Sequence, residues 1–138
     1  MTAKDYLKDI RTQEFRLRSI EEAILVLETK ATKVTSTWSD MPGGGVNDGI
    51  AGIVLKLVET RQKYIAQWDR LIDDRNEAMK MLAKLKKNYH YDVLWLYYIR
   101  CKNWIEVSEA MHISESYAFM LHGQALAELQ LIMQDSSK

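Results

Sequence analysis

The sequence is poor in residues that cross-link chains or interrupt helices. Cys101 is the only cysteine and Pro42 the only proline among 138 residues, and four of the six glycines fall between positions 43 and 49. A lone cysteine excludes an intramolecular disulfide and a thiolate zinc cluster. Because the helix-breaking residues are concentrated in one short segment, the rest of the chain is free to form long helices.

The sequence also lacks an apolar run of membrane-spanning length. The first residues are interrupted by Lys4, Asp5, Lys8 and Asp9, so they have no apolar core of the kind that a signal peptide needs. The longest uncharged apolar run, residues 93–99, is too short to cross a bilayer. We therefore expect a cytoplasmic protein with no membrane partner.

Recognisable catalytic patterns are absent as well. The three histidines, His90, His112 and His122, show no metal-ligand spacing. Asp73 and Asp74 are adjacent, so on a helix they point about 100° apart and do not converge as an acid–base pair. The glycine run lacks the following Lys-Ser or Lys-Thr of a phosphate-binding loop. We expect no enzyme activity, no cofactor, no metal and no small-molecule substrate.

The formal net charge is zero, but the charges are unevenly distributed. Residues 80–102 carry one acid, Asp92, against the basic residues Lys80, Lys84, Lys86, Lys87, Arg100 and Lys102. No Lys or Arg occurs in residues 103–137, which contain Glu106, Glu109, Glu115, Glu128 and Asp135. The four lysines at 80–87 form a basic collar that either contacts a nucleic-acid backbone or is a solvated helix face.

Two series of apolar residues at helical spacing flank the Gly/Pro segment 35–49, which we expect to be a loop. The first series, in residues 1–34, comprises Leu7, Ile10, Leu17, Ile20, Ile24 and Leu27. The second, in residues 50–88, alternates steps of four and three and includes Val54, Leu57, Arg61, Tyr64, Trp68, Leu71, Arg75, Ala78 and Leu82. This heptad spacing predicts a long, coiled-coil-like helical hairpin. Such a long apolar stripe favours a homodimer through the long helices.

Arg61 and Arg75 occupy positions of the second series that are otherwise mostly apolar. A charge at such a position controls register, forms an ion pair with the facing helix or marks the end of packing. The sequence leaves these three readings open.

Residues 103–129 carry the signals of two short helices joined by a tight turn. Asn103 with Glu106 forms a predicted capping box, and Ser114 is the predicted N-cap of the second helix. In that helix the apolar residues Ala118, Leu121, Ala125 and Leu129 recur at helical spacing and form the expected buried stripe. The apolar residues expected at the joint are Ile105, Val107, Met111, Ile113 and Leu121. A preceding helix completes the domain, and the aromatic residues that cluster around it are expected in the core: Tyr89, Tyr91, Trp95, Tyr97, Tyr98 and Trp104. The predicted fold is all-α, with a three-helix helix-turn-helix domain at 89–134 and a tail at 135–138.

The stretch from Leu94 to Leu129, LWLYYIRCKNWIEVSEAMHISESYAFMLHGQALAEL, is similar to the promoter-reading C-terminal domain of sigma factors. Together with the opening MTAKDYLKDIR, it makes the whole chain resemble small sigma-like helix-turn-helix proteins of phages and prophages of Gram-positive bacteria. Relatives of that group include the ArpU and RinA types of late transcription regulators. The resemblance implies a DNA-binding transcription regulator whose recognition helix enters the major groove.

Exposed positions of the expected recognition helix lack the Arg and Lys typical of that family, and are Ser116, Tyr117, Phe119, Met120 and Gln124. Two hypotheses follow. In the first, Ser116, Tyr117, Met120 and Gln124 contact duplex DNA while Arg100 and Lys102 anchor its backbone. In the second, an acidic, degenerate helix-turn-helix presents Tyr117, Phe119 and Met120 to a host or phage protein, such as a polymerase, a packaging component or a defence nuclease.

Overall fold

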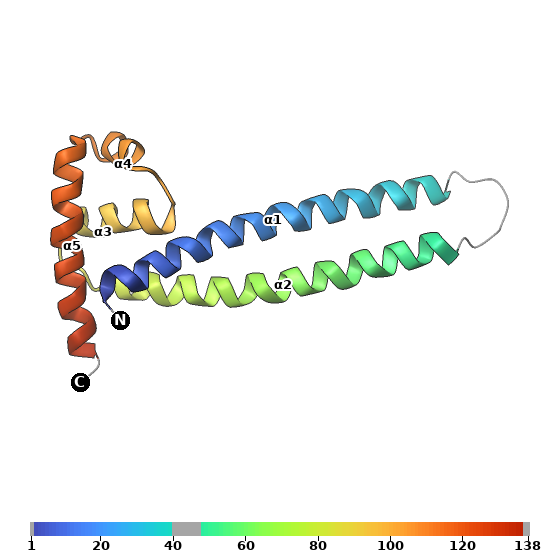
Figure 1. Cartoon of the computed structure of the whole chain (residues 1–138), viewed down its shortest axis with the longest axis horizontal. Coiled ribbons are helices and arrows are strands. Elements are labelled where there is room, and N and C mark those ends of the chain that lie inside the picture. Colours follow the sequence, from blue (N-terminus) through green and yellow to red (C-terminus); the bar gives the residue numbers. More distant parts are fainter. Residues whose placement is uncertain (1, 40–47, 137–138) are drawn as a thin grey trace. The chain divides into compact units, whose positions relative to one another are not determined.

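The computed structural model describes residues 2–39 and 48–136, and these residues form helices without a strand. The helices are α1 (Ala3–Ser39), α2 (Asp48–Leu82), α3 (Asn88–Leu94), the π-helical segment η1 (Trp95–Ile99), α4 (Trp104–Met111) and α5 (Glu115–Ser136) (Figure 1). The predicted all-α class is confirmed. None of the described helices combines the length and the apolar character needed to cross a membrane.

The ends of the two long helices differ from those predicted. α1 continues to Ser39, past the expected end at residue 34, and α2 begins at Asp48. Of the expected loop 35–49, residues 40–47 lie outside the described residues. α2 ends at Leu82 instead of residue 88, because the buried Leu85 turns into the core and Glu128 accepts the Lys86 backbone N–H at 2.8 Å.

Contacts divide the chain into two compact units. We call Leu17–Arg70 the hairpin unit, and Met1–Arg16 with Leu71–Lys138 the core unit. In the hairpin unit, α1 and α2 run antiparallel, and the Arg61 Nε donates to Glu28 Oε1 at 2.9 Å. The Trp68 indole N–H donates to Glu21 Oε1, also at 2.9 Å.

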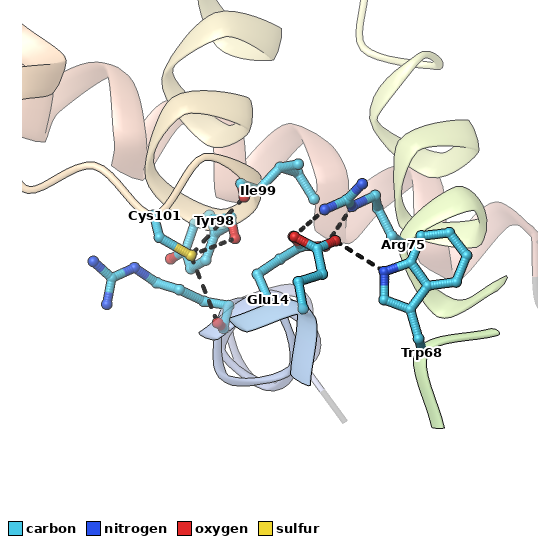
Figure 2. Close-up of polar contacts among 8 residues, drawn as sticks. Glu14, Trp68, Arg75, Tyr98, Ile99 and Cys101 are labelled. Atoms are coloured by element: carbon cyan, nitrogen blue, oxygen red, sulfur yellow. Dashed lines mark hydrogen bonds and ion pairs between the residues drawn. The ribbon is translucent and has the colours of Figure 1, made fainter. Parts of the chain in front are cut away.

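The core unit repeats this pairing one heptad further along. Arg75 Nε and a terminal guanidinium nitrogen donate to the two Glu14 carboxylate oxygens at 2.7 and 2.6 Å (Figure 2). The acceptor glutamates on α1 thus recur every seven residues, at positions 14, 21 and 28. The donors on α2 show the same spacing, at positions 61, 68 and 75. Of the three readings of Arg61 and Arg75, the structure supports the interhelix ion pair.

The hydrophobic core of the core unit lies among α3, η1, α4 and α5, closed by the first turns of α1 and the last turns of α2. Its fully buried side chains include Leu7, Leu82, Leu94, Tyr98, Val107, Leu121 and Leu129. The predicted α5 stripe of Ala118, Leu121, Ala125 and Leu129 is entirely buried. Ile105 was expected at the joint but is 56% exposed, because it lies two residues from the buried Val107 and so on the opposite side of α4.

The aromatic residues around α3 were expected in the core, and the structure confirms this only in part. Tyr98 is fully buried, and Tyr91, Trp95, Tyr97 and Trp104 are partly buried against the core. Tyr89 is 43% exposed, and it lies in the first turn of α3 instead of continuing the apolar series of α2. There the Tyr89 ring lies 5.6 Å from the Lys87 ammonium.

The π-helical segment η1 follows α3 in the chain and contacts α1 at Arg11. The Arg100 N–H donates to the Trp95 carbonyl at 3.0 Å, and the Tyr97 carbonyl accepts from Arg11 Nε at 2.9 Å. Cys101 follows with a positive φ of 55°, and its thiol contacts the Arg11 carbonyl at 3.7 Å (Figure 2). These contacts hold the amino end of α1 beside the segment that precedes α4.

Candidate macromolecule-binding surface

The α4–turn–α5 region has the caps that the sequence predicts. Asn103 Oδ1 accepts the Glu106 N–H at 2.8 Å, and the Glu106 carboxylate accepts the Asn103 N–H at 3.1 Å. Ser114 Oγ accepts the Tyr117 N–H at 3.1 Å, which caps α5. Between the helices, His112 adopts a left-handed conformation with φ 58° and ψ 44°. The predicted capping box and second N-cap are therefore confirmed.

Three large apolar side chains of α5 are exposed in the core unit. Tyr117 is 46% exposed, Phe119 51% and Met120 47%. They were expected to be presented together to a partner, but successive helical residues are about 100° apart, so Tyr117 and Phe119 point in nearly opposite directions. Each of these two rings lines a different groove, and Met120 lines neither.

We call the first of these the Tyr117 groove. It has a volume of about 540 Å³ and lies among α3, η1, the end of α4 and the start of α5. Its walls are mostly apolar and include Tyr89, Trp95, Met111, Ile113 and Tyr117. The Arg100 guanidinium lies 5.6 Å from the centre of the Trp95 ring, so a predicted anchoring residue is held at a wall of this groove.

The second, the Phe119 groove, is lined by α1 as well as by η1, α4 and α5. It has a volume of about 500 Å³, and its lining includes Lys4, Lys8, Arg11, Phe15, Trp104, Phe119 and His122. None of the three basic residues was predicted from the sequence to be part of a binding site. Their spacing of four and three places them on one face of a helix, but nothing in the sequence indicates that α1 packs beside α5.

A stack of rings forms the aromatic wall of the Phe119 groove. Trp104 stacks on Tyr97 with ring centres 4.3 Å apart, and the ring centre of Phe119 lies 4.6 Å from that of Trp104. Arg11 extends the stack, with its guanidinium 4.3 Å from the centre of the Tyr97 ring.

At the inner end of this groove, the Tyr98 hydroxyl lies 2.7 Å from His122 Nε2. Burial, with a smaller contribution from the positive charge of Lys4, lowers the pKa of His122 to about 4. Burial, followed by the neighbouring Tyr97, raises the pKa of the Tyr98 hydroxyl. At neutral pH the hydroxyl therefore donates to a neutral imidazole.

The remaining predicted site residues lie at separate places in the core unit. Ser116 is exposed, and the exposed Gln124 lies 3.4 Å from His90 Nε2 through its carbonyl oxygen. Lys102 is 3.8 Å from the Glu106 carboxylate. The predicted collar residues Lys80, Lys84, Lys86 and Lys87 are all exposed, and Lys80 is 4.0 Å from Glu77.

One acid of α5 is engaged by groups that precede the helix-turn-helix. Glu128 accepts the Lys86 backbone N–H, and its other oxygen lies 2.8 Å from His90 Nδ1. The Lys86 hydrogen bond, followed by the contact with His90, lowers the pKa of Glu128. Glu128 thus joins α5 to the turn after α2. Among the described residues, no group of three or more His, Cys, Asp or Glu side chains is arranged to hold a metal ion.

These features define an all-α protein in which a helical hairpin joins a compact unit that ends in two capped helices and a tight turn. Residues 32–130 match the DUF1492 family, described as proteins of unknown function. Because this range covers more than half of the chain, the protein belongs to the DUF1492 family. The matched range begins after Lys4, Lys8 and Arg11. Neither the curated proteins nor the solved structures contain a significant match to the chain.

Proposed function

We propose that this protein is a DNA-binding transcription regulator of a phage or prophage, in which α4 and α5 act as a sigma-like helix-turn-helix. The observation that carries the proposal is the capped α4–α5 pair, whose second helix buries Ala118, Leu121 and Ala125 and leaves Ser116 and Met120 exposed. An exposed amino-terminal half is what a recognition helix needs in order to enter the major groove. The resemblance to sigma-like regulators supports the same reading.

In this proposal, Ser116, Tyr117, Met120 and Gln124 meet base edges or sugar-phosphate, and Arg100 and Lys102 contact the backbone beside α5. Backbone contacts supply most non-specific affinity for DNA, and α4 and α5 contain no Lys or Arg of their own. Contacts between phosphates and cationic side chains must therefore come from residues outside the two helices. Arg100 and Lys102 immediately precede α4, and the lysine collar adds further charge.

The test is a mobility-shift titration of random-sequence duplex DNA at low salt with the variant Arg100→Glu/Lys102→Glu. The expected result is loss of binding, because two phosphate contacts become repulsive. The milder Arg100→Gln/Lys102→Gln pair should flatten the slope of log affinity against log salt by about 1.8, or roughly 0.9 for each lost contact. Lys56→Glu/Lys63→Glu, which makes the same charge change on exposed positions of the hairpin unit, is the matched control. Binding that is equally strong in all variants would refute the assignment.

A second candidate function rests on the exposed Phe119 and Met120 and on the acids of α4 and α5. Exposed apolar side chains beside negative charge suit a protein partner better than a phosphate backbone. In this reading the helix-turn-helix binds or inhibits a host macromolecule. A pulldown from host lysate with Phe119→Ser/Met120→Ser tests it: the wild-type chain should retain a specific protein that the double variant loses, and an identical catch from both would dismiss the idea.

We also propose that the hairpin unit mediates a homodimer. Its helices expose large apolar side chains that the single chain leaves uncovered: Leu25, Val26, Ile53, Leu55 and Val58. Paired sites on DNA, as in many helix-turn-helix regulators, suit a dimeric protein. Size-exclusion chromatography with light scattering should give twice the mass of one chain. A mass of 16.1 kDa at all micromolar concentrations would exclude the dimer.

A further inference from the structure

The Phe119 groove combines a row of cations with a wall of aromatic rings. Lys4, Lys8 and Arg11 follow one another on a single face of α1, at positions i, i+4 and i+7. The rise of an α-helix separates the first two by roughly 6 Å along its axis and the second two by roughly 4.5 Å. Lys4 and Lys8 are exposed, and neither forms an ion pair within the described part of the chain. Their charges are available to a ligand.

Phe119 provides the open end of the aromatic wall. It rests on Trp104 at 4.6 Å while half of its side chain remains exposed. Trp104 in turn stacks on Tyr97, and Tyr97 contacts the Arg11 guanidinium. These contacts hold in place the ring on which Phe119 packs. A supported ring with a free surface is a platform on which another planar group can stack, because it is already ordered before the ligand arrives.

We infer that the Phe119 groove binds single-stranded nucleic acid, with phosphates at Lys4 and Lys8 and an unpaired base on Phe119. A positive row that follows the backbone and an aromatic platform for the bases are the two elements by which single strands are held without sequence preference. The volume of about 500 Å³ lies within the range of roughly 300 to 1,000 Å³ typical of small-ligand sites, which leaves room for a nucleotide.

The chemistry favours a single strand over the two other anionic polymers that the cations would attract. The bases of a duplex are already stacked on one another, so they have no free face for Phe119. An acidic peptide would neutralise Lys4 and Lys8 but would leave the ring platform unused. This inference goes beyond the proposed reading of duplex DNA, because it uses a different wall of the core unit and does not involve Arg100 or Lys102.

The experiment is fluorescence anisotropy of a labelled oligothymidylate titrated with the full chain at low salt. Phe119→Ala should weaken binding by about five- to hundredfold, the range expected when one base loses its aromatic partner. Leu131→Ala is the matched control: it lies on the same helix and is 63% exposed, but it is outside the groove and is not among the residues proposed to contact duplex DNA. It should leave the affinity for the single strand unchanged. Both side chains are exposed, and circular dichroism checks that both variants remain folded.

A second pair of variants tests the cations. Lys4→Gln/Lys8→Gln should flatten the slope of log affinity against log salt by about 1.4, since each phosphate contact to a single strand contributes roughly 0.7. Lys56→Gln/Lys63→Gln, which removes the same charge from the hairpin unit, should leave the slope unchanged.

Three results would overturn the inference. These are no oligothymidylate binding at low salt, equal affinity of the wild type and Phe119→Ala, and displacement by polyglutamate as effective as by unlabelled oligothymidylate. The proposed regulator function is tested separately by duplex binding and by the Arg100 and Lys102 variants. Failure of either assay therefore leaves the other conclusion standing.

Discussion

Glu14 on α1 and Arg75 on α2 form an ion pair in which a buried carboxylate receives two hydrogen bonds from one guanidinium. The Glu14 side chain is 3% exposed and that of Arg75 is 32% exposed, with contacts of 2.7 and 2.6 Å. The pair between Glu28 and Arg61 has the same residue types but is nearly half exposed on both sides. A Glu–Arg ion pair is thus largely buried in the core unit, and a pair of the same residue types is exposed in the hairpin unit.

Arg75→Ala should therefore destabilise the protein far more than Arg61→Ala. Removing Arg75 leaves the Glu14 carboxylate buried without its cation, and we expect a loss of about 3 kcal/mol in the free energy of unfolding. Removing Arg61 exposes a carboxylate that water already reaches, so its loss should stay below about 1 kcal/mol. Urea titration measures both. Equal losses would show that burial does not distinguish the two pairs.

Substitution of Ser114 is predicted to lower stability, whereas substitution of Ser116 is predicted to affect binding alone. Ser114→Ala removes the hydroxyl that accepts the Tyr117 N–H and should cost about 1 kcal/mol of stability. Ser116 is exposed two residues further along and has no cap to lose, so Ser116→Ala should leave the melting temperature unchanged. In the proposed regulator, Ser116→Ala alters DNA affinity instead. A melting temperature lowered as much by Ser116→Ala as by Ser114→Ala would contradict this division.

His112 occupies a backbone conformation that favours glycine. With φ 58°, its Cβ is crowded, and replacement by glycine should stabilise the protein by about 0.5 to 1 kcal/mol after the greater freedom of glycine in the unfolded chain is allowed for. His112→Ala keeps the Cβ and should bring no gain. The melting temperatures of the wild type and the two variants test this prediction. An equal rise for His112→Ala and His112→Gly would show that the gain in stability does not come from relief of the backbone conformation.

The stability of the protein should decrease as the pH is lowered from about 6.5 to about 4, the interval between the ordinary and the lowered pKa of His122. In this interval the unfolded chain binds a proton at His122 and the folded chain does not, so acid favours unfolding. Below about 4 both states are protonated and this contribution no longer changes.

The variant His122→Gln isolates this effect, because it removes the titrating group and leaves Glu128 in place. Its unfolding free energy should change less between pH 6.5 and 4.5 than that of the wild type. Glu128 has a lowered pKa and should contribute at more acidic pH, where its carboxylate becomes protonated in the unfolded chain first. Parallel pH profiles for His122→Gln and the wild type would mean that His122 titrates normally in the folded protein.

The sequence predicted those elements whose causes are local. The capping box at Asn103 and Glu106, the N-cap at Ser114 and the buried stripe of α5 depend on residues within one or two turns of each other, and all are found as expected. The end of α2 was predicted less well. The apolar spacing continues through Leu85 and Tyr89, but a hydrogen bond from Lys86 to Glu128, which lies far along the chain, accompanies the turn.

In the candidate site, too, the sequence predicted the local features but not those that depend on the packing of distant helices. Exposure of Tyr117, Phe119 and Met120 followed from helical spacing, and the structure agrees. Their separation into two grooves did not follow, because it depends on which helices lie on either side of α5. Lys4, Lys8 and Arg11 carry no signal in the sequence beyond a shared helix face, and they become part of a groove only through the packing of α1 against η1 and α5.

The amino-acid sequence by itself determined that the chain forms helices, where the last two begin, and which side of α5 is buried, because helical periodicity and capping act between residues close together in the chain. Only the tertiary structure decided that basic residues from the first turns meet aromatic residues from the last third of the chain. Contacts between segments so far apart arise from the packing of complete helices, and no local pattern encodes them.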